Sequence, residues 1–150
     1  HFEPKWIFLD APLSLPGVYR ELADCDNYHF RRADIECRAM SPMFLGGLAA
    51  RAIELRDKLQ QQGSKVYETY PKIQAHRLDL PSLGYKKLKS ALPACSEAVT
   101  SFFKKPVRVQ SKDILTWHHL DALLALMSAM AYETENCQVY GNPSEGLIYV

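Results

Sequence analysis

His118 and Asp121 place an imidazole and a carboxylate at the start of residues 116–132, the most apolar stretch of the chain. In a helix these two side chains share one face, because they lie three positions apart. Residues 122–132 carry no charge, which predicts a helix buried on all sides. The run is too short for a membrane span, which needs ~20 residues. The pair at its entrance either holds a metal ion or a proton, or only stabilises the helix start, where an Asp is favoured.

Two further carboxylates follow β-rich runs. Asp10 comes directly after the apolar run 5–9 and before Pro12, and Glu68 lies within the run 65–70 before Pro71. Open α/β sheets place their ligands at the carboxyl ends of strands, where Asp10 is expected; the alternative is that Asp10 caps its own turn. A carboxylate such as Glu68 in a core strand is costly unless it is paired, metal-bound or at the wet end of the strand.

The remaining pattern predicts the elements that must position these residues. Proline, glycine and hydrophobic spacing indicate helices at 31–38, from Ser41-Pro42 to Gly63, and at 71–77, 85–92, 96–103 and 116–132, with a loop at 79–84. Asp34 and Arg38 are spaced as an i,i+4 ion pair. Runs 137–140 and 147–150 flank turn residues and predict a hairpin. The order predicts one α/β or α+β domain of 150 residues with a small sheet.

Charge is unevenly distributed although the net charge is only +1. Residues 84–112 hold seven Lys or Arg and one acid, whereas residues 113–150 hold five acids and neither Lys nor Arg. A basic segment beside an acidic helix suits a metal-dependent phosphodiester enzyme, and a solvated basic face is the alternative. The four Cys show no CxxC pair, which predicts reduced thiols in a cytoplasmic protein. No signal peptide or transmembrane run is visible, so we expect no membrane partner.

Four phrases in order carry a family likeness. They are IFLDAPLSLP (7–16), VYETYP (66–71), HHLDALLALMSA (118–129) and VYGNPSEGLIYV (139–150). Together they resemble a predicted-nuclease family with an RNase H-like fold, catalogued as a domain of unknown function (family 429) and distantly similar to RuvC-type resolvases. The resemblance extends from Ile7 to Val150.

The resemblance implies an α/β, RNase H-like fold whose acids bind two Mg²⁺ or Mn²⁺ ions. In such a site, two ions ~3.5–4 Å apart activate the attacking water and stabilise the leaving oxygen. It matches Asp10 to a strand-end acid, Asp121 to the last-helix acid and His118 to its companion, and makes these three the metal ligands. It also matches Glu68 to the Glu of the family's Glu-x-Tyr-Pro phrase, and Asp34 to an Arg/Asp-rich segment. The implied catalytic residues are Asp10, Glu68, His118 and Asp121.

The basic segment would then contact the phosphates of a nucleic acid. Contacts of this kind position a substrate without reading its sequence. The expected substrate-binding residues are Lys86, Lys87, Lys104, Lys105 and Arg108.

One departure from the family pattern affects the expected architecture. The family begins with a three-strand meander that carries its first acid, whereas this sequence starts at what would be the fourth strand. We therefore expect a single, N-terminally incomplete RNase H-like domain, whose sheet would be completed by a preceding segment or by a second copy of the chain. A bare strand at 5–10 would be prone to such pairing.

Three functions fit these patterns. The first is a metal-dependent nuclease. The second is a catalytically inactive RNase H-fold binding or interaction domain, in which His118 and Asp121 only hydrogen-bond. The third is an RNase H-fold phosphotransferase, which is least favoured because no phosphate-binding glycine loop is visible.

Overall fold

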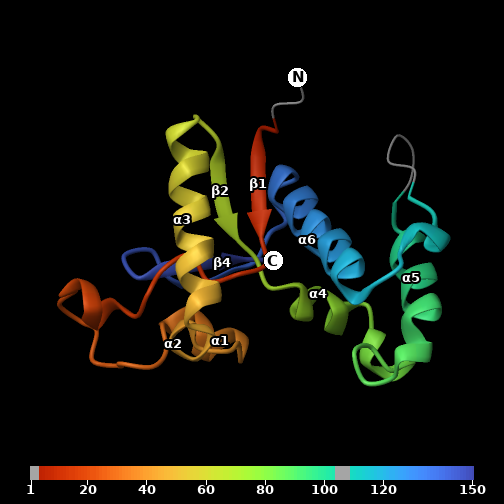
Figure 1. Ribbon diagram of the computed structural model, residues 1–150, viewed down its shortest axis with the longest axis horizontal. Coiled ribbons are helices and arrows are strands. Elements are labelled where there is room, and N and C mark those ends of the chain that lie inside the picture. Colours follow the sequence, from red (N-terminus) through yellow and green to blue (C-terminus); the bar gives the residue numbers. More distant parts are fainter. Residues whose placement is uncertain (1–3, 104–108) are drawn as a thin grey trace.

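A four-stranded mixed sheet organises the computed structural model, which describes residues 4–103 and 109–150 (Figure 1). Its strands are β1 (Trp6–Leu9), β2 (Lys65–Glu68), β3 (Val139–Asn142) and β4 (Gly146–Tyr149), in the order β1-β2-β4-β3. β1 and β2 are parallel, with Leu9 beside Glu68. β2 and β4 are parallel at Glu68 and Ile148, and β3 and β4 form the antiparallel hairpin predicted from the turn residues. The mixed α/β class and all four predicted strands are thus confirmed.

Helices connect and cover the sheet. They are α1 (Arg32–Cys37), α2 (Pro42–Leu45), α3 (Gly47–Gln61), α4 (Pro71–Arg77), α5 (Leu92–Thr100) and α6 (Trp117–Glu133), with short 3₁₀ segments at Gly17–Arg20, Leu80–Leu83, Lys89–Ala91 and Ser111–Asp113. In Figure 1 the strands β1 and β2 lie between α3 on one side and α6 on the other. None of the helices within residues 4–103 and 109–150 is long and apolar enough to cross a membrane.

Gly46 divides the helix that the sequence predicts from Pro42 onward. Ser41 caps its start, since its side-chain oxygen accepts a hydrogen bond from the Met43 N–H at 3.0 Å. Gly46 then adopts φ 49° and ψ −111°, a conformation for which glycine pays no Cβ penalty. The predicted single helix was therefore wrong, and α2 and α3 are separate.

The segment before α6 also differs from its prediction. The two helices expected at 85–92 and 96–103 are replaced by turns, a 3₁₀ segment and the single helix α5. Pro93 does not separate two helices but lies in the first turn of α5, where its missing N–H costs nothing. The chain before α5 is thereby left as a turn that carries Tyr85 and Lys86.

Helix α6 is anchored to the sheet by an aromatic cluster at its carboxyl end. The ring of Tyr132 packs against Trp6 and Phe8 of β1 and against Tyr67 and Tyr149, at centroid distances of 4.7–5.8 Å. The Tyr67 and Tyr132 hydroxyls lie 2.9 Å apart. These contacts fix the helix on which Asp121 is carried.

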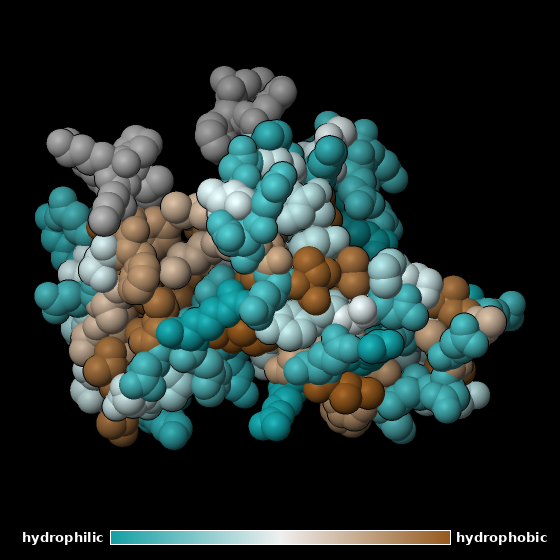
Figure 2. All heavy atoms as spheres, turned by 180° about the vertical axis from the view of Figure 1, so that it is seen from behind, coloured by the Kyte–Doolittle hydropathy of each residue, from teal (hydrophilic) through white to brown (hydrophobic). Residues whose placement is uncertain are grey.

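The expectation that α6 is buried on all sides was wrong. Leu120 and Leu124 are fully buried in the core, whereas Leu126 and Met130 are 38% and 45% exposed. The rear view in Figure 2 shows hydrophobic areas among the hydrophilic ones, as these exposures require. One stripe of α6 faces the core, and another reaches the surface.

Candidate functional site

Asp10 and Asp121 come together from two separate elements. Asp10 directly follows β1, as its position after the apolar run predicted, and Asp121 lies in the second turn of α6. The pKa of Asp10 is raised to about 6, first because surrounding protein atoms displace water and second because the Asp121 charge repels its own. Asp10 is exposed and Asp121 is buried, and the two carboxyl groups lie near enough for the charge of one to affect the pKa of the other. The structure therefore assembles these two predicted site residues.

Asp121 is buried and already has two partners. The Tyr85 hydroxyl donates a hydrogen bond to Oδ1, and the Lys86 Nζ lies 2.5 Å from Oδ2. Burial and the hydrogen bond to Asp121 both raise the pKa of the Tyr85 hydroxyl. The Lys86 side chain is 47% exposed, so its ammonium group can exchange Asp121 for solvent or for a ligand.

Lys86 also has an uncommon backbone conformation. Its φ is 56°, in the left-handed region that non-glycine residues enter rarely and at a cost of about 1–3 kcal/mol. The strain and the ion pair thus occur at the same residue, next to the two acids.

His118 stands on the exposed surface one turn before Asp121. Its charge lowers the pKa of Asp10, which opposes the larger effects of burial and Asp121. Across residues 4–103 and 109–150, however, no three His, Cys, Asp or Glu side chains converge closely enough to hold a metal ion. Asp10, His118 and Asp121 therefore lie in one region without forming a closed set of ligands.

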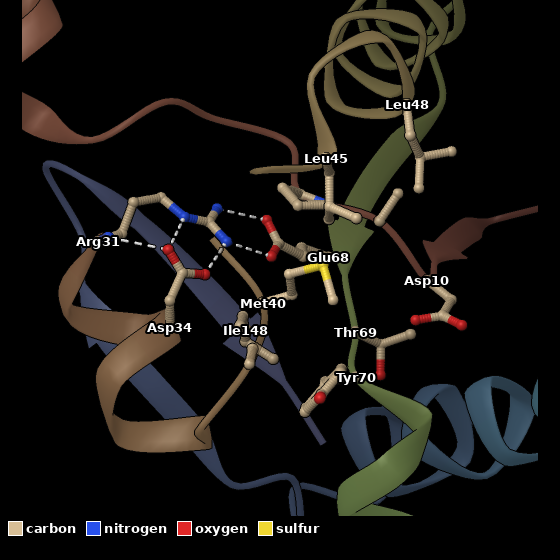
Figure 3. A pocket seen from close by; sticks show the side chains of 13 residues that line it. Asp10, Arg31, Asp34, Met40, Leu45, Leu48, Glu68, Thr69, Tyr70 and Ile148 are labelled. Atoms are coloured by element: carbon tan, nitrogen blue, oxygen red, sulfur yellow. Dashed lines mark hydrogen bonds and ion pairs between the residues drawn. The ribbon is translucent and has the colours of Figure 1, made fainter. Parts of the chain in front are cut away.

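Glu68 belongs to a separate, buried ion-pair network. Arg31 donates to both of its oxygens, at 2.6 Å and 2.7 Å, and the Leu13 backbone N–H donates to Oε2 at 2.7 Å. Arg31 also binds Asp34, at 2.5 Å and 3.0 Å (Figure 3). Burial raises the pKa of Glu68, and the hydrogen bonds from Arg31 oppose that rise because they favour the ionised carboxylate. Glu68 is thus paired, as a core carboxylate requires.

The expected pair of Asp34 with Arg38 is replaced by this network. Arg38 is the carboxyl cap of α1, with φ 50°, whereas Arg31 is the amino cap and is completely buried. Sequence reasoning missed Arg31, although its i,i+3 spacing to Asp34 was a usable signal. It also missed Tyr85, for which a lone tyrosine in a turn gives no signal.

A cavity of about 270 Å³ lies between Asp10 and the network of Arg31, Asp34 and Glu68, and Asp121 does not line it. Asp10 lines one end of it, and Arg31, Asp34 and Glu68 line the other. Apolar side chains form most of the remaining wall: Pro12, Met40, Leu45, Leu48 and Ile148. Figure 3 shows Asp10 and Glu68 on either side of this space, with Thr69 and Tyr70 between them.

Two of the residues predicted to contact phosphate lie in the turn before α5, and their predicted role stays a prediction. Lys86 pairs with Asp121, and Lys87 is exposed in the turn that follows. Lys104, Lys105 and Arg108 lie outside the described residues, so their predicted role stays a prediction.

Comparison with known proteins gives a family and nothing finer. No curated protein and no solved structure matches the chain. The sequence model of one family, described as "Protein of unknown function (DUF429)", matches residues 1–145, which is nearly the entire chain. That description states neither an RNase H-like fold nor a nuclease activity. The chain belongs to the DUF429 family.

Proposed function

We propose that this protein is a divalent-metal-dependent nuclease of the RNase H-like type, which holds Mg²⁺ or Mn²⁺ between Asp10 and Asp121. The observation that carries the proposal is the convergence of two carboxylates, one from the end of β1 and one from α6. The Asp121 charge disfavours the ionised form of Asp10, and a bound dication would remove that repulsion.

The donor set fits one ion better than two. Mg²⁺ is commonly held by one or two carboxylates, with water and substrate phosphate completing its octahedron. Asp10 and Asp121 supply that number of ligands, whereas a second ion would need acids that residues 4–103 and 109–150 do not bring together here. When bound, such an ion polarises a phosphoryl oxygen and lowers the pKa of bound water.

Three other side chains support the same reaction from their positions. Lys86 neutralises Asp121 in the resting state and moves its ammonium group to the substrate phosphate when the ion is present. His118, exposed one turn before Asp121, is placed to carry a proton to or from solvent. Glu68 would act indirectly, as a positioning residue. It accepts a hydrogen bond from the Leu13 N–H and so holds the segment that follows Asp10.

Metal titration with matched variants tests this assignment. We expect calorimetry to show Mn²⁺ binding to the wild type, with affinity reduced at least tenfold in Asp121→Asn. Asp113→Asn, which alters an exposed acid outside the site, should bind as the wild type does. Cleavage of a labelled single-stranded oligonucleotide should follow the same order. Equal Mn²⁺ binding by the wild type and Asp121→Asn would contradict the proposal.

The ion pair between Lys86 and Asp121 favours a second candidate, a binding domain without catalysis. In that case Lys86 is the permanent partner of Asp121. No divalent ion would then raise the melting temperature, and Lys86→Met would lower it because Asp121 would lose its counter-charge. Under the nuclease proposal Lys86→Met instead strengthens Mn²⁺ binding, since a competing cation is removed.

A further inference from the structure

The cavity beside Asp10 has an apolar wall of a defined kind. Met40, Leu45 and Leu48 line it on one side, and Ile148 of β4 contributes from the sheet. Its volume of about 270 Å³ lies just below the ~300–1,000 Å³ of small-molecule sites. The space therefore suits one ring system rather than an extended ligand.

The charged groups at the inner end of the cavity are not free to bind an ionic ligand. Arg31, Asp34 and Glu68 satisfy one another through hydrogen bonds of 2.5–3.0 Å. A charged ligand there would have to break this network, at a cost of several kcal/mol. The occupant of the cavity is consequently an uncharged and largely apolar group.

Two hydroxyl groups offer the occupant limited polar contact. The Thr69 hydroxyl is buried and has no hydrogen-bond partner within the described residues, although Thr69 lines the cavity. A rotation about its Cα–Cβ bond would present this hydroxyl to the cavity. Tyr70 is also in the wall, and no side-chain hydrogen bond to another described residue is among the influences on its pKa. A buried hydroxyl without a partner costs free energy, which a ligand atom would recover.

The position of the cavity relative to Asp10 identifies the group. Asp10 belongs both to the cavity wall and to the candidate metal site. A phosphate bound through a divalent cation at Asp10 and Asp121 would have its attached sugar and base near the mouth of the cavity that Asp10 lines. We propose that the cavity receives the nucleobase next to the phosphate held at Asp10 and Asp121, an inference that rests on the proposed function.

Two properties of the substrate follow from this placement. A base inside a protein cavity is unstacked and unpaired, which costs little in a single strand and several kcal/mol in a duplex. The substrate is therefore single-stranded nucleic acid. Aliphatic walls contact any base alike, and base identity is read by hydrogen bonds to its edges. The Thr69 and Tyr70 hydroxyls and the Asp10 carboxylate offer few such contacts, so we expect the cavity to accept all four bases with small differences.

Two leucines on α3 provide a matched pair of variants. Leu48 lines the cavity and is 44% exposed, whereas Leu55 lies two turns further along α3, is 46% exposed and does not line it. We expect Leu48→Trp to fill the cavity and raise KM for a single-stranded oligonucleotide about tenfold, as expected for loss of one base contact. kcat should change less, and Leu55→Trp should leave both unchanged. The same oligonucleotide with abasic sugar-phosphate units should be cleaved equally by all three proteins.

A second measurement separates this inference from the proposed function. Adenosine and thymidine carry no phosphate, so their binding, followed by NMR, does not depend on metal or catalysis. We expect both nucleosides to bind to the wild type. Their binding to Thr69→Val should be weaker, and Leu48→Trp should not bind them. Binding without any oligonucleotide cleavage would support the cavity and contradict the nuclease.

Three outcomes would overturn the cavity assignment. The first is cleavage in which Leu48→Trp affects base-bearing and abasic strands equally. The second is an absence of nucleoside binding to the wild type at millimolar concentration. Binding of free nucleosides with unaltered KM in Leu48→Trp would place the base elsewhere and would also refute it.

Discussion

The Asp10 carboxyl is exposed, and the fold nevertheless favours its protonated form. Its pKa is about 6 in the folded chain against 3.8 for the free side chain, so the folded state binds the proton more tightly. The stabilisation from protonated Asp10 is complete below pH 3.8 and is lost as the pH rises through 6. In buffer containing EDTA, Asp10→Asn should melt on the order of 2 °C higher than the wild type at pH 7.5, allowing for solvent screening.

The same comparison at acid pH controls that prediction. Near pH 3.5 the Asp10 carboxyl is neutral in the folded chain, so the melting temperatures of Asp10→Asn and wild type should converge. Calorimetric scans at both pH values provide the measurement. A lower melting temperature for Asp10→Asn at pH 7.5 would mean that the carboxylate is stabilised rather than strained.

Arg31 illustrates the opposite situation, a charge that the fold depends on. Its guanidinium is completely buried between Asp34 and Glu68. Arg31→Met would leave two carboxylates without a partner, which should lower the free energy of unfolding by about 3–5 kcal/mol. Arg32→Met is the matched control, because Arg32 pairs with Glu36 at the surface and such pairs contribute about 0–1 kcal/mol. Urea denaturation of both variants tests this, and equal losses would contradict the buried network.

At the scale of elements, Tyr132 determines how α6 rests on the sheet. Tyr132→Ala removes contacts to four aromatic rings and should lower the free energy of unfolding by about 2–4 kcal/mol. Tyr132→Phe keeps the ring contacts and loses only the Tyr67 hydroxyl bond, a change of about 1 kcal/mol. Asp121 lies about 16 Å away along the helix, so Tyr132→Phe should leave Mn²⁺ affinity unchanged. Similar losses in both variants would show that the hydroxyl bond, not the packing, holds α6.

The elements that position the site were predictable where one local signal dominates. The apolar run before Asp10 and the uncharged run after Asp121 are strong patterns, and they placed these residues at a strand end and a helix start. Gly46 was harder to interpret, because a glycine within a helical pattern either lowers helix stability or breaks the helix. Pro93 was ambiguous for a different reason, because a proline is equally compatible with a break between two helices and with the first turn of one helix.

The side-chain partners could not be predicted from the sequence. Arg31 and Glu68 are 37 positions apart. They meet because α1 packs on β3 and β4, and β4 pairs with β2 at Glu68. Lys86 was expected to contact phosphate as part of a basic segment. Its contact with Asp121 depends on a left-handed backbone conformation that no residue type in the turn requires.

At the scale of the whole molecule, β1 is the edge of the sheet and pairs with β2 alone among the described strands. The Leu9 carbonyl accepts from the Thr69 N–H at 2.9 Å, so the backbone groups of Ile7 and Leu9 point toward β2. Those of Trp6 and Phe8 then point away from it. The strand contains neither a charge nor a proline, and such edges pair readily with another strand.

Amide hydrogen exchange distinguishes an open edge from a covered one. In dilute solution we expect the Phe8 amide to exchange at least about 100-fold faster than that of Ile7, because only the latter is hydrogen-bonded within the sheet. If a second copy completes the sheet, which is one of the two arrangements expected from the sequence, protection of Phe8 should rise with protein concentration while that of Ile7 stays constant. Slow exchange at Phe8 in dilute protein would mean that a single chain already covers β1. Fast exchange at every concentration would refute self-pairing, and the edge would then be available to a strand from a different polypeptide.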